Sequence, residues 1–408
     1  MVAGCSDADA RPGALGYPLP ECPKLDVDPC DTRAPECRQR LLELAACVYG
    51  VDSAPDVPIR VVTEAQLIDE LEAADGEQDD ADDAAELEHL QRALVDLQLL
   101  APGALTEGHG RIEALVDSVD GVYRDAEHGI ALVDRGMPKN DAESNAVLVH
   151  ELVHAIQDAV YDLKAWQAPY DSDLDTLLAL RSVSEGQATY AQFRVVFAML
   201  GYDLARFDLS GPMDDFRSRL MRSAHADRSP YTASLTTFPY AAGVSPAARG
   251  WRASLPHFSA SRFEAPPLTT WRALSDSYAL ALPEPDPLEL TAPDPDPDFI
   301  AVGSSALGAF MLELFLGSQG FDAETARSLA LDWRADRLWV YAGPEQHTGF
   351  LWQVELQTTD WGRSLDDARP PPAGVVREHR GRRLFVAGSD PPPAFLLTTG
   401  RRFVDAPG

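Results

Sequence analysis

Two histidines and a glutamate stand together in HELVHAIQD, which spans residues 150 to 158. His150 and His154 are one helical turn apart, and Glu151 directly follows the first of them. Two imidazoles at this spacing can bind one zinc ion, and the carboxylate between them can act as a general base on a zinc-bound water. The stretch therefore predicts a hydrolytic zinc centre. A surface helix with two solvent-facing histidines is the alternative interpretation.

A helix that begins near residue 140 is expected to carry this motif. Asn140 is in position to cap the helix, and Glu143 completes a capping box. At 100° per residue, the two histidines, Glu151 and Asp158 fall within about 100° of one another. The opposite side carries aliphatic residues, namely Val149, Leu152, Ile156 and Ala159. Such a helix buries its aliphatic side and directs its polar side chains into one sector.

A zinc site needs a third protein ligand, and no third histidine follows the motif at the usual spacing. Glu185, in the stretch SVSEGQATYAQF, lies 31 positions after the second histidine. It stands between Ser184 and Gly186 in a predicted helix, and glycine at that position allows another backbone to come close. The sequence thus predicts a metal site made by His150, His154 and Glu185.

These residues resemble the site of a gluzincin metallopeptidase. SEGQATY is similar to the N-E-G-F-A segment that supplies the glutamate ligand in zinc aminopeptidases, although the gap from the second histidine is longer here. A closer resemblance is to poorly characterised bacterial lipoproteins with H-E-L-T-H-A-L-Q-D and E-G-x-A-T, in which a G-F-Y hairpin precedes the active-site helix. GVYRDAEHGIALVD (residues 121–134) corresponds to that hairpin, and FPYAAG (residues 238–243) to a later F-x-Y-x-x-G segment. The resemblance covers about residues 115 to 370.

The resemblance implies zinc-dependent hydrolysis of a peptide or protein substrate, with Glu151 as the general base. Tyr240, in FPYAAG, is the expected second electrophile, and Tyr190 is the alternative. Endopeptidase and aminopeptidase action both stay open, although the lack of a G-A-M-E-N-like segment favours an endopeptidase. A zinc-binding lipoprotein of the cell envelope that binds or supports other molecules without turnover is the alternative function.

One departure from the family pattern concerns the groups that orient the ligands. Thermolysin-like enzymes place an aspartate four residues after the glutamate ligand, where it orients a histidine. Thr189 occupies that position here. Asp158, one turn after His154, is therefore the expected substitute.

All five cysteines lie within the first 47 residues. Cys5 ends the stretch VAGC, which resembles the end of a bacterial lipobox, whose cysteine is lipidated. The other four are Cys22, Cys30, Cys37 and Cys47, which can form two disulfides in an oxidising compartment. We therefore expect an exported protein, either a lipoprotein of the cell envelope or a secreted protein. A cytosolic protein and a cysteine metal cluster are the alternatives, but no C-x-x-C spacing occurs.

The charge and hydropathy pattern narrows the possible partners. A formal net charge of −31 argues against nucleic acid, because phosphate contacts need clustered lysine and arginine. No run of about 18 apolar residues is present, so we expect membrane contact only through a lipid at Cys5. The sequence does not indicate an oligomeric state.

The distribution of elements predicts an α+β protein with a zincin-like, mainly helical core. A β-hairpin or small sheet is expected beside the active-site helix, followed by a mixed C-terminal region. Four segments are predicted: a tether and cysteine-rich segment (1–56), a catalytic region (57–282), a Pro/Asp-rich connector (283–298) and an α/β region that packs on the catalytic part (299–408).

Overall fold

The computed structural model describes residues 19–76, 81–103, 112, 116, 119–136, 141–170, 173–227, 229–253, 255–286, 288–359, 361, 365, 369–389 and 392–406. Cys5 and Asn140 lie outside these residues. Within them, no helix is long and apolar enough to cross a membrane.

The fold is mixed α+β, which confirms the predicted class. The helices are α1 (Pro35–Tyr49), α2 (Glu64–Gly76), α3 (Ala81–Asp96), α5 (Ala142–Tyr161), α6 (Leu163–Gln167), α7 (Leu174–Met199), α8 (Ser210–Ala226), α9 (Pro230–Ala253), α10 (Leu255–Glu264), α11 (Thr270–Ser277), α12 (Gly308–Ser318), α13 (Ala323–Leu331) and α15 (Ala394–Asp405). The short 3-10 turns are η1 (Asp125–Glu127), η2 (Ala168–Tyr170) and η3 (Pro344–Gln346).

The strands form two sheets. They are β1 (Ile59–Val62), β2 (Gly121–Arg124), β3 (Gly129–Val133), β4 (Ile300–Ser305), β5 (Trp333–Ala342), β6 (Thr348–Leu356), β7 (Val375–Arg380) and β8 (Arg383–Gly388). The smaller sheet has the order β1-β3-β2, and the larger has the order β4-β5-β6-β8-β7. Strands β2 and β3 pair antiparallel as the predicted hairpin, whereas β1 pairs parallel to β3.

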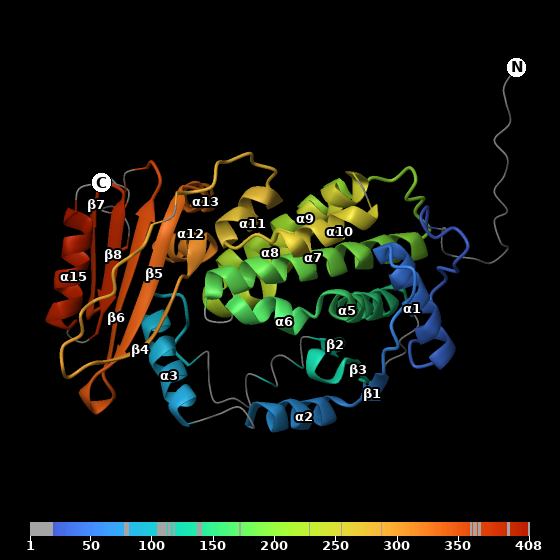
Figure 1. Ribbon diagram of the computed structural model, residues 1–408, viewed down its shortest axis with the longest axis horizontal. Helices are drawn as coiled ribbons and strands as arrows, with labels where there is room; N and C mark the ends of the chain where they lie inside the picture. Colours follow the sequence, from blue (N-terminus) through green and yellow to red (C-terminus); the bar gives the residue numbers. More distant parts are fainter. Residues whose placement is uncertain are drawn as a thin grey trace, which may run out of the picture.

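The large sheet stands at one end of a helical layer, and the small sheet lies below the layer, under α5 (Figure 1). Helices α7, α8, α9, α10 and α11 form this layer, and α5 lies between it and the small sheet. Helix α15 covers one face of the large sheet, while α12 and α13 lie between its other face and the helical layer. A mainly helical scaffold therefore carries the predicted metal-binding motif, which lies on α5.

Two hydrophobic cores share α7 and α9. The larger joins the inner face of the large sheet to the helices, and Phe238 and Phe310 meet in it with ring centroids 4.4 Å apart. The second core packs α1 against α5, α7 and the end of α9. Residues from both the predicted catalytic region and the predicted C-terminal region lie in the larger core, and the four-segment division stays a prediction.

Two disulfides tie the N-terminal segment to itself. Cys22 bonds to Cys47, and Cys30 bonds to Cys37. These bonds indicate an oxidising, exported environment. The segment also contacts the motif helix, because the amide of Asn145 donates to Cys30 O at 2.7 Å and its oxygen accepts from Cys30 N at 3.0 Å.

Helix α5 buries most of the predicted aliphatic side. Val149, Leu152 and Ile156 are at most 1% exposed, but Ala159 is exposed near the end of the helix, contrary to the prediction. Asp141 is the N-cap of α5, and its side chain accepts from Ser144 N at 2.7 Å. The helix thus begins one residue later than a cap at Asn140 would give.

Candidate metal centre

The side chains of His150, His154 and Glu185 converge on one point between α5 and α7. The two Nε2 atoms lie 3.0 Å apart, and Oε2 of Glu185 lies 3.2 Å from each of them. The side chains are 7%, 12% and 12% exposed, respectively. Among the described residues they form the group that could hold a metal ion.

Close helix packing sets the position of Glu185. A Cβ added at Gly186 would lie 2.3 Å from the backbone carbon of Gly243, so α7 and α9 touch at two glycines. No larger side chain fits there unless the helices separate. The glycine beside Glu185 therefore has the role that the sequence suggests, and its close neighbour is the FPYAAG segment of α9.

The donor set fits a divalent metal ion. Ligands about 2.0–2.1 Å from a tetrahedral zinc ion lie about 3.3 Å apart, close to the spacing of the three atoms here. Ring nitrogens and a carboxylate oxygen are all lone-pair donors when the histidines are neutral, so they can meet without a metal only by sharing protons. One cation bound between them would accept a lone pair from each of the three atoms.

The charges of the cluster are strongly coupled. Burial alone would raise the pKa of Glu185, but His154 and His150 hold that pKa well below its ordinary value. Burial alone would lower the pKa of His154, yet Glu185 raises it to about 9. The site therefore favours a carboxylate beside positive charge, whether that charge is a proton or a metal ion.

Glu151 lies beside the cluster and is held by the hairpin. Its Oε2 accepts from Tyr123 N at 2.7 Å, and a Cβ at Gly121 would touch its Cγ at 3.4 Å. Burial raises the pKa of Glu151 despite the nearby histidines. A carboxylate with a raised pKa, fixed next to a group that could hold a metal ion, is suited to accept and return a proton.

Gln157 occupies the orienting role that we expected of Asp158. Its side-chain oxygen lies 2.9 Å from Nδ1 of His154, and its amide donates to Ser184 O at 3.1 Å. These bonds give Nδ1 the proton and leave Nε2 of His154 free to bind a metal. Nδ1 of His150 is buried and has no hydrogen-bond partner in the described part of the chain.

Asp158 instead connects α5 to the hairpin, so the prediction that it orients a histidine of the motif was wrong. It accepts from Tyr123 Oη at 2.7 Å, from His128 Nδ1 at 2.8 Å and from Leu163 N at 2.9 Å. The carboxylate is nearly buried, whereas the His128 side chain is 79% exposed. Asp158 therefore positions the hairpin whose backbone holds Glu151.

Thr189 contacts none of the three ligands through a hydrogen bond. It is 1% exposed, and its hydroxyl has no hydrogen-bond partner among the described residues. The position that carries an orienting aspartate in thermolysin-like enzymes is here a packing position.

The two tyrosines considered as the second electrophile lie in different surroundings. Tyr240 stacks on His150 with ring centroids 5.8 Å apart, and its hydroxyl lies near Glu185 and Glu151. Tyr190 is 3% exposed and packs against Trp251 in the core, with centroids 5.3 Å apart. Burial, together with the two nearby glutamates, raises the pKa of Tyr240, so its hydroxyl keeps its proton and can donate it in a hydrogen bond.

Sequence reasoning missed Gln157 and Tyr123. Gln157 stands three residues after His154, a spacing at which helical side chains meet, so a local signal was present. The role of Tyr123 depends on how β2 lies against α5, which no local pattern specifies.

The comparisons with known proteins add no identification. No family model matches the chain, and neither a curated protein nor a solved structure matches it. The interpretation of the site therefore depends on its own geometry.

Proposed function

We propose that the protein is a zinc-dependent peptidase with Glu151 as its general base. The observation that carries the proposal is the convergence of His150 Nε2, His154 Nε2 and Glu185 Oε2, with Glu151 fixed beside them. A purely structural metal site usually has four protein ligands, whereas three ligands and an adjacent carboxylate are typical of a hydrolytic site.

The roles of the chain's own groups follow from their contacts. A zinc ion bound by the three ligands would supply Lewis-acid activation of water and of a substrate carbonyl. Oε2 of Glu151 is engaged by Tyr123 N, so Oε1 is the oxygen that accepts the proton of the attacking water and passes it to the leaving amine. Tyr240 keeps its proton, so its hydroxyl can donate a hydrogen bond to the developing oxyanion.

We also propose that α5, α7 and the β1-β3-β2 sheet form a zincin-like unit. The support is the arrangement itself: a small sheet lies beside the motif helix, and the third ligand comes from the next long helix. A solved structure with and without zinc would test this, and a separation of Glu185 from the two histidines in the zinc-bound form would overturn it.

Metal analysis and a single variant test the function. After zinc is added and excess removed, we expect about one equivalent of bound zinc by plasma mass spectrometry, and cleavage of internally quenched peptides. Glu151→Gln should keep the zinc and lose about 100-fold or more in kcat, because general-base catalysis contributes 10²–10⁴-fold. If both forms bind zinc and neither cleaves peptides, the protein is the non-catalytic zinc-binding alternative.

We infer further that the protein works in the cell envelope or outside the cell, with a lipid at Cys5 as a membrane anchor. The two disulfides support the oxidising compartment. Metabolic labelling with an alkyne fatty acid should mark the wild-type protein and not Cys5→Ser. Equal labelling of both would refute the anchor.

A further inference from the structure

One edge of the large sheet is open. Strand β4 pairs with β5, and no strand of the described residues pairs with its other side. Its exposure is high for a strand, with Ile300 72% exposed. Such an edge presents a row of backbone N–H and C=O groups to which another extended chain can bond.

A cavity of about 540 Å³ lies along this edge. Leu174 and Leu177 of α7 and Tyr231 of α9 line it, together with residues 302–305 of β4. Leu338 and Val340 of β5, which face the larger core, also line it, so the cavity lies under the inner face of the sheet, beside the β4 edge. The cavity thus combines an apolar wall with a strand that has no partner strand on its outer side among the described residues.

The cavity and the metal centre lie on the same side of α7. Leu177, Arg181 and Glu185 follow one another at four-residue steps, which places them above one another on a helix. The eight-residue separation corresponds to about 12 Å along the axis. An extended peptide covers this distance in three or four residues at about 3.3 Å each.

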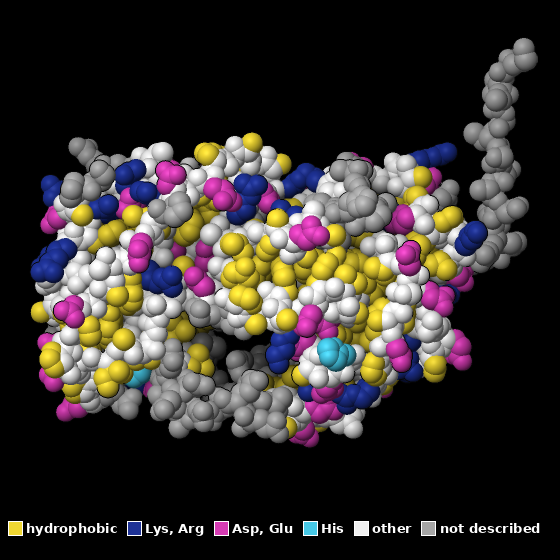
Figure 2. All heavy atoms as spheres, in the orientation of Figure 1, with side chains coloured by type: hydrophobic (Ala, Val, Ile, Leu, Met, Phe, Trp, Pro, Cys, Tyr) yellow, Lys and Arg dark blue, Asp and Glu magenta, His cyan; other side chains and the backbone are white. Residues whose placement is uncertain are grey.

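The surface between the two sites is partly open. Arg181 lies between them with its side chain 35% exposed, and its Nη2 is 4.0 Å from Oε1 of Glu185. On the face shown in Figure 2, hydrophobic side chains gather over α6 and α7, and the surface is hollowed between this patch and α3. A chain that leaves the metal centre along α7 therefore meets apolar surface before it reaches β4.

We propose that the cavity between β4 and α7 is a substrate subsite that binds an extended, apolar segment of a polypeptide by strand addition to β4. The inference rests on the proposed peptidase function, because it places the cleaved bond at the metal centre. The substrate class is then an unfolded or extended polypeptide with a large apolar side chain three or four residues from the cleaved bond. A short peptide that ends before the cavity is a poor substrate.

Binding can be measured without cleavage in the full-length Glu151→Gln variant. The probes are fluorescein-labelled, Gly/Ser-rich dodecapeptides with a single phenylalanine moved through successive positions. Their affinity is measured by fluorescence anisotropy with zinc-loaded and with metal-free protein. We expect affinity about tenfold higher at the best position than for the peptide without phenylalanine, because one buried aromatic side chain supplies at least that much. In wild-type protein, mass spectrometry of the products should place that phenylalanine three or four residues from the cleaved bond.

Two perturbations test the contributions of the apolar wall and of the strand edge to peptide binding separately. Leu177→Asp should abolish the phenylalanine preference, mainly by raising KM with little change in kcat. Leu200→Asp, at the exposed far end of the same helix, is the matched control and should behave as wild type. Peptides N-methylated at and beside the phenylalanine cannot donate to β4 and should bind about tenfold more weakly. This second perturbation needs no variant that could fail to fold.

The outcomes distinguish the subsite from the proposed function. Phenylalanine-dependent binding to the Glu151→Gln variant, together with no cleavage by zinc-loaded wild-type protein, would support the subsite and refute the peptidase. If the cleavage rate is the same for every phenylalanine position, in Leu177→Asp and with N-methylated peptides, the peptidase is supported and the subsite is overturned. A preference that depends on Leu177 but not on N-methylation would overturn strand addition.

Discussion

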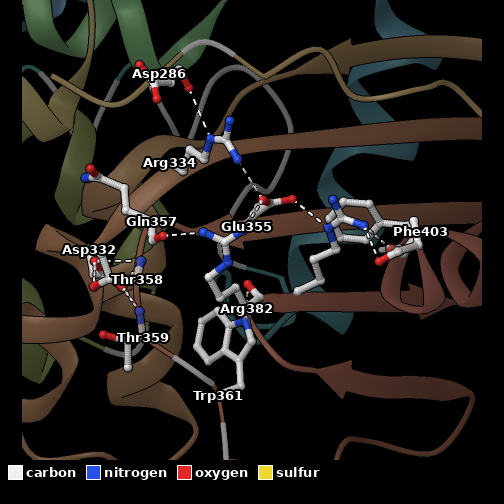
Figure 3. A network of polar contacts seen from close by, with 12 residues as sticks. Asp286, Asp332, Arg334, Glu355, Gln357, Thr358, Thr359, Trp361, Arg382 and Phe403 are labelled. Atoms are coloured by element: carbon white, nitrogen blue, oxygen red, sulfur yellow. Dashed lines mark hydrogen bonds and ion pairs between the residues drawn. The ribbon is translucent and has the colours of Figure 1, made fainter. Parts of the chain in front are cut away.

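Two buried glutamates show different ways in which this fold accommodates a carboxylate. Glu355, on β6, is fully buried among arginines: its Oε1 accepts from Arg334 at 2.9 Å and its Oε2 from Arg383 at 2.7 Å (Figure 3). Glu185 is also nearly buried, but Nε2 atoms of two histidines converge on one of its oxygens. The first carboxylate is neutralised by arginine side chains, whereas the second lies at the proposed metal site, where a proton or a metal ion would neutralise it.

This difference distinguishes a structural cluster from a candidate functional one. The Glu355 network joins the large sheet to its surroundings, and arginine side chains neutralise its carboxylate without any added ion. In the cluster at Glu185, the three lone-pair donors are compensated only when they share protons or bind a metal ion. A buried polar group whose partners do not balance it therefore indicates a function more strongly than burial or a pKa shift alone.

The largest effect should come from breaking the complete network. Glu355→Ala leaves the partly buried guanidinium groups of Arg334, Arg382 and Arg383 without their carboxylate, so we expect a loss of about 3 kcal/mol in unfolding free energy. Urea unfolding measures it. Glu378→Ala, which removes an exposed ion pair with Arg401 from the same sheet, is the control and should cost less than about 1 kcal/mol. A similar loss of unfolding free energy in both variants would contradict the idea that the buried Glu355 network stabilises the fold more than an exposed ion pair does.

Breaking the incomplete cluster should affect metal binding, and should affect the metal-free fold less than Glu355→Ala does, because His154 can lose its proton when the carboxylate that raises its pKa is gone. Glu185→Ala removes one of three ligands, so we expect zinc affinity to fall by at least about 100-fold, or about 2.7 kcal/mol. Chelator competition gives the affinity, and urea unfolding in EDTA gives the stability of the metal-free form. A strong loss of metal-free stability, as in Glu355→Ala, would show that Glu185 is a structural charge.

A smaller loss of zinc affinity tests which residue orients His154. Gln157→Ala removes the bond to Nδ1 of His154 and should weaken zinc binding by about tenfold. Asp158→Asn is the matched neighbour and should leave zinc affinity nearly unchanged, because its contacts go to the hairpin. The reverse ranking would restore Asp158 to the role that the sequence suggested.

The sequence predicts the part of the site that one helix builds. His150, Glu151 and His154 share a sector because of their spacing alone, and the helix and its buried side follow from the same periodicity. The sequence points to Glu185 through the need for a third ligand and its place in a later predicted helix, but its approach to the histidines depends on how α5 packs on α7. Asp158 was misassigned because Tyr123 and His128, about 30 residues earlier in the chain, bind its carboxylate. Partners that distant cannot be derived from helical geometry.

A third buried carboxylate, Asp175, shows that a proton can replace both arginine and metal. It accepts from Thr270 N at 2.8 Å, and no cation pairs with it within the described residues. Burial raises its pKa to about 8, and the nearby Asp336 adds to the effect. Asp175 therefore keeps a proton in the folded protein at pH values at which the unfolded chain has lost it.

The sign of the resulting pH dependence follows from proton counts. Between the unfolded pKa near 3.8 and the folded pKa of about 8, the folded state binds more protons, so stability falls as the pH rises through this window. The slope for one proton is at most about 1.4 kcal/mol per pH unit. Asp175→Asn is always neutral and should lose this dependence, so its stability relative to wild type should improve steadily from pH 5 to pH 8 in urea unfolding. Parallel curves for the two proteins would mean that Asp175 is ionised in the folded state, and that this fold buries a carboxylate without arginine, metal or proton.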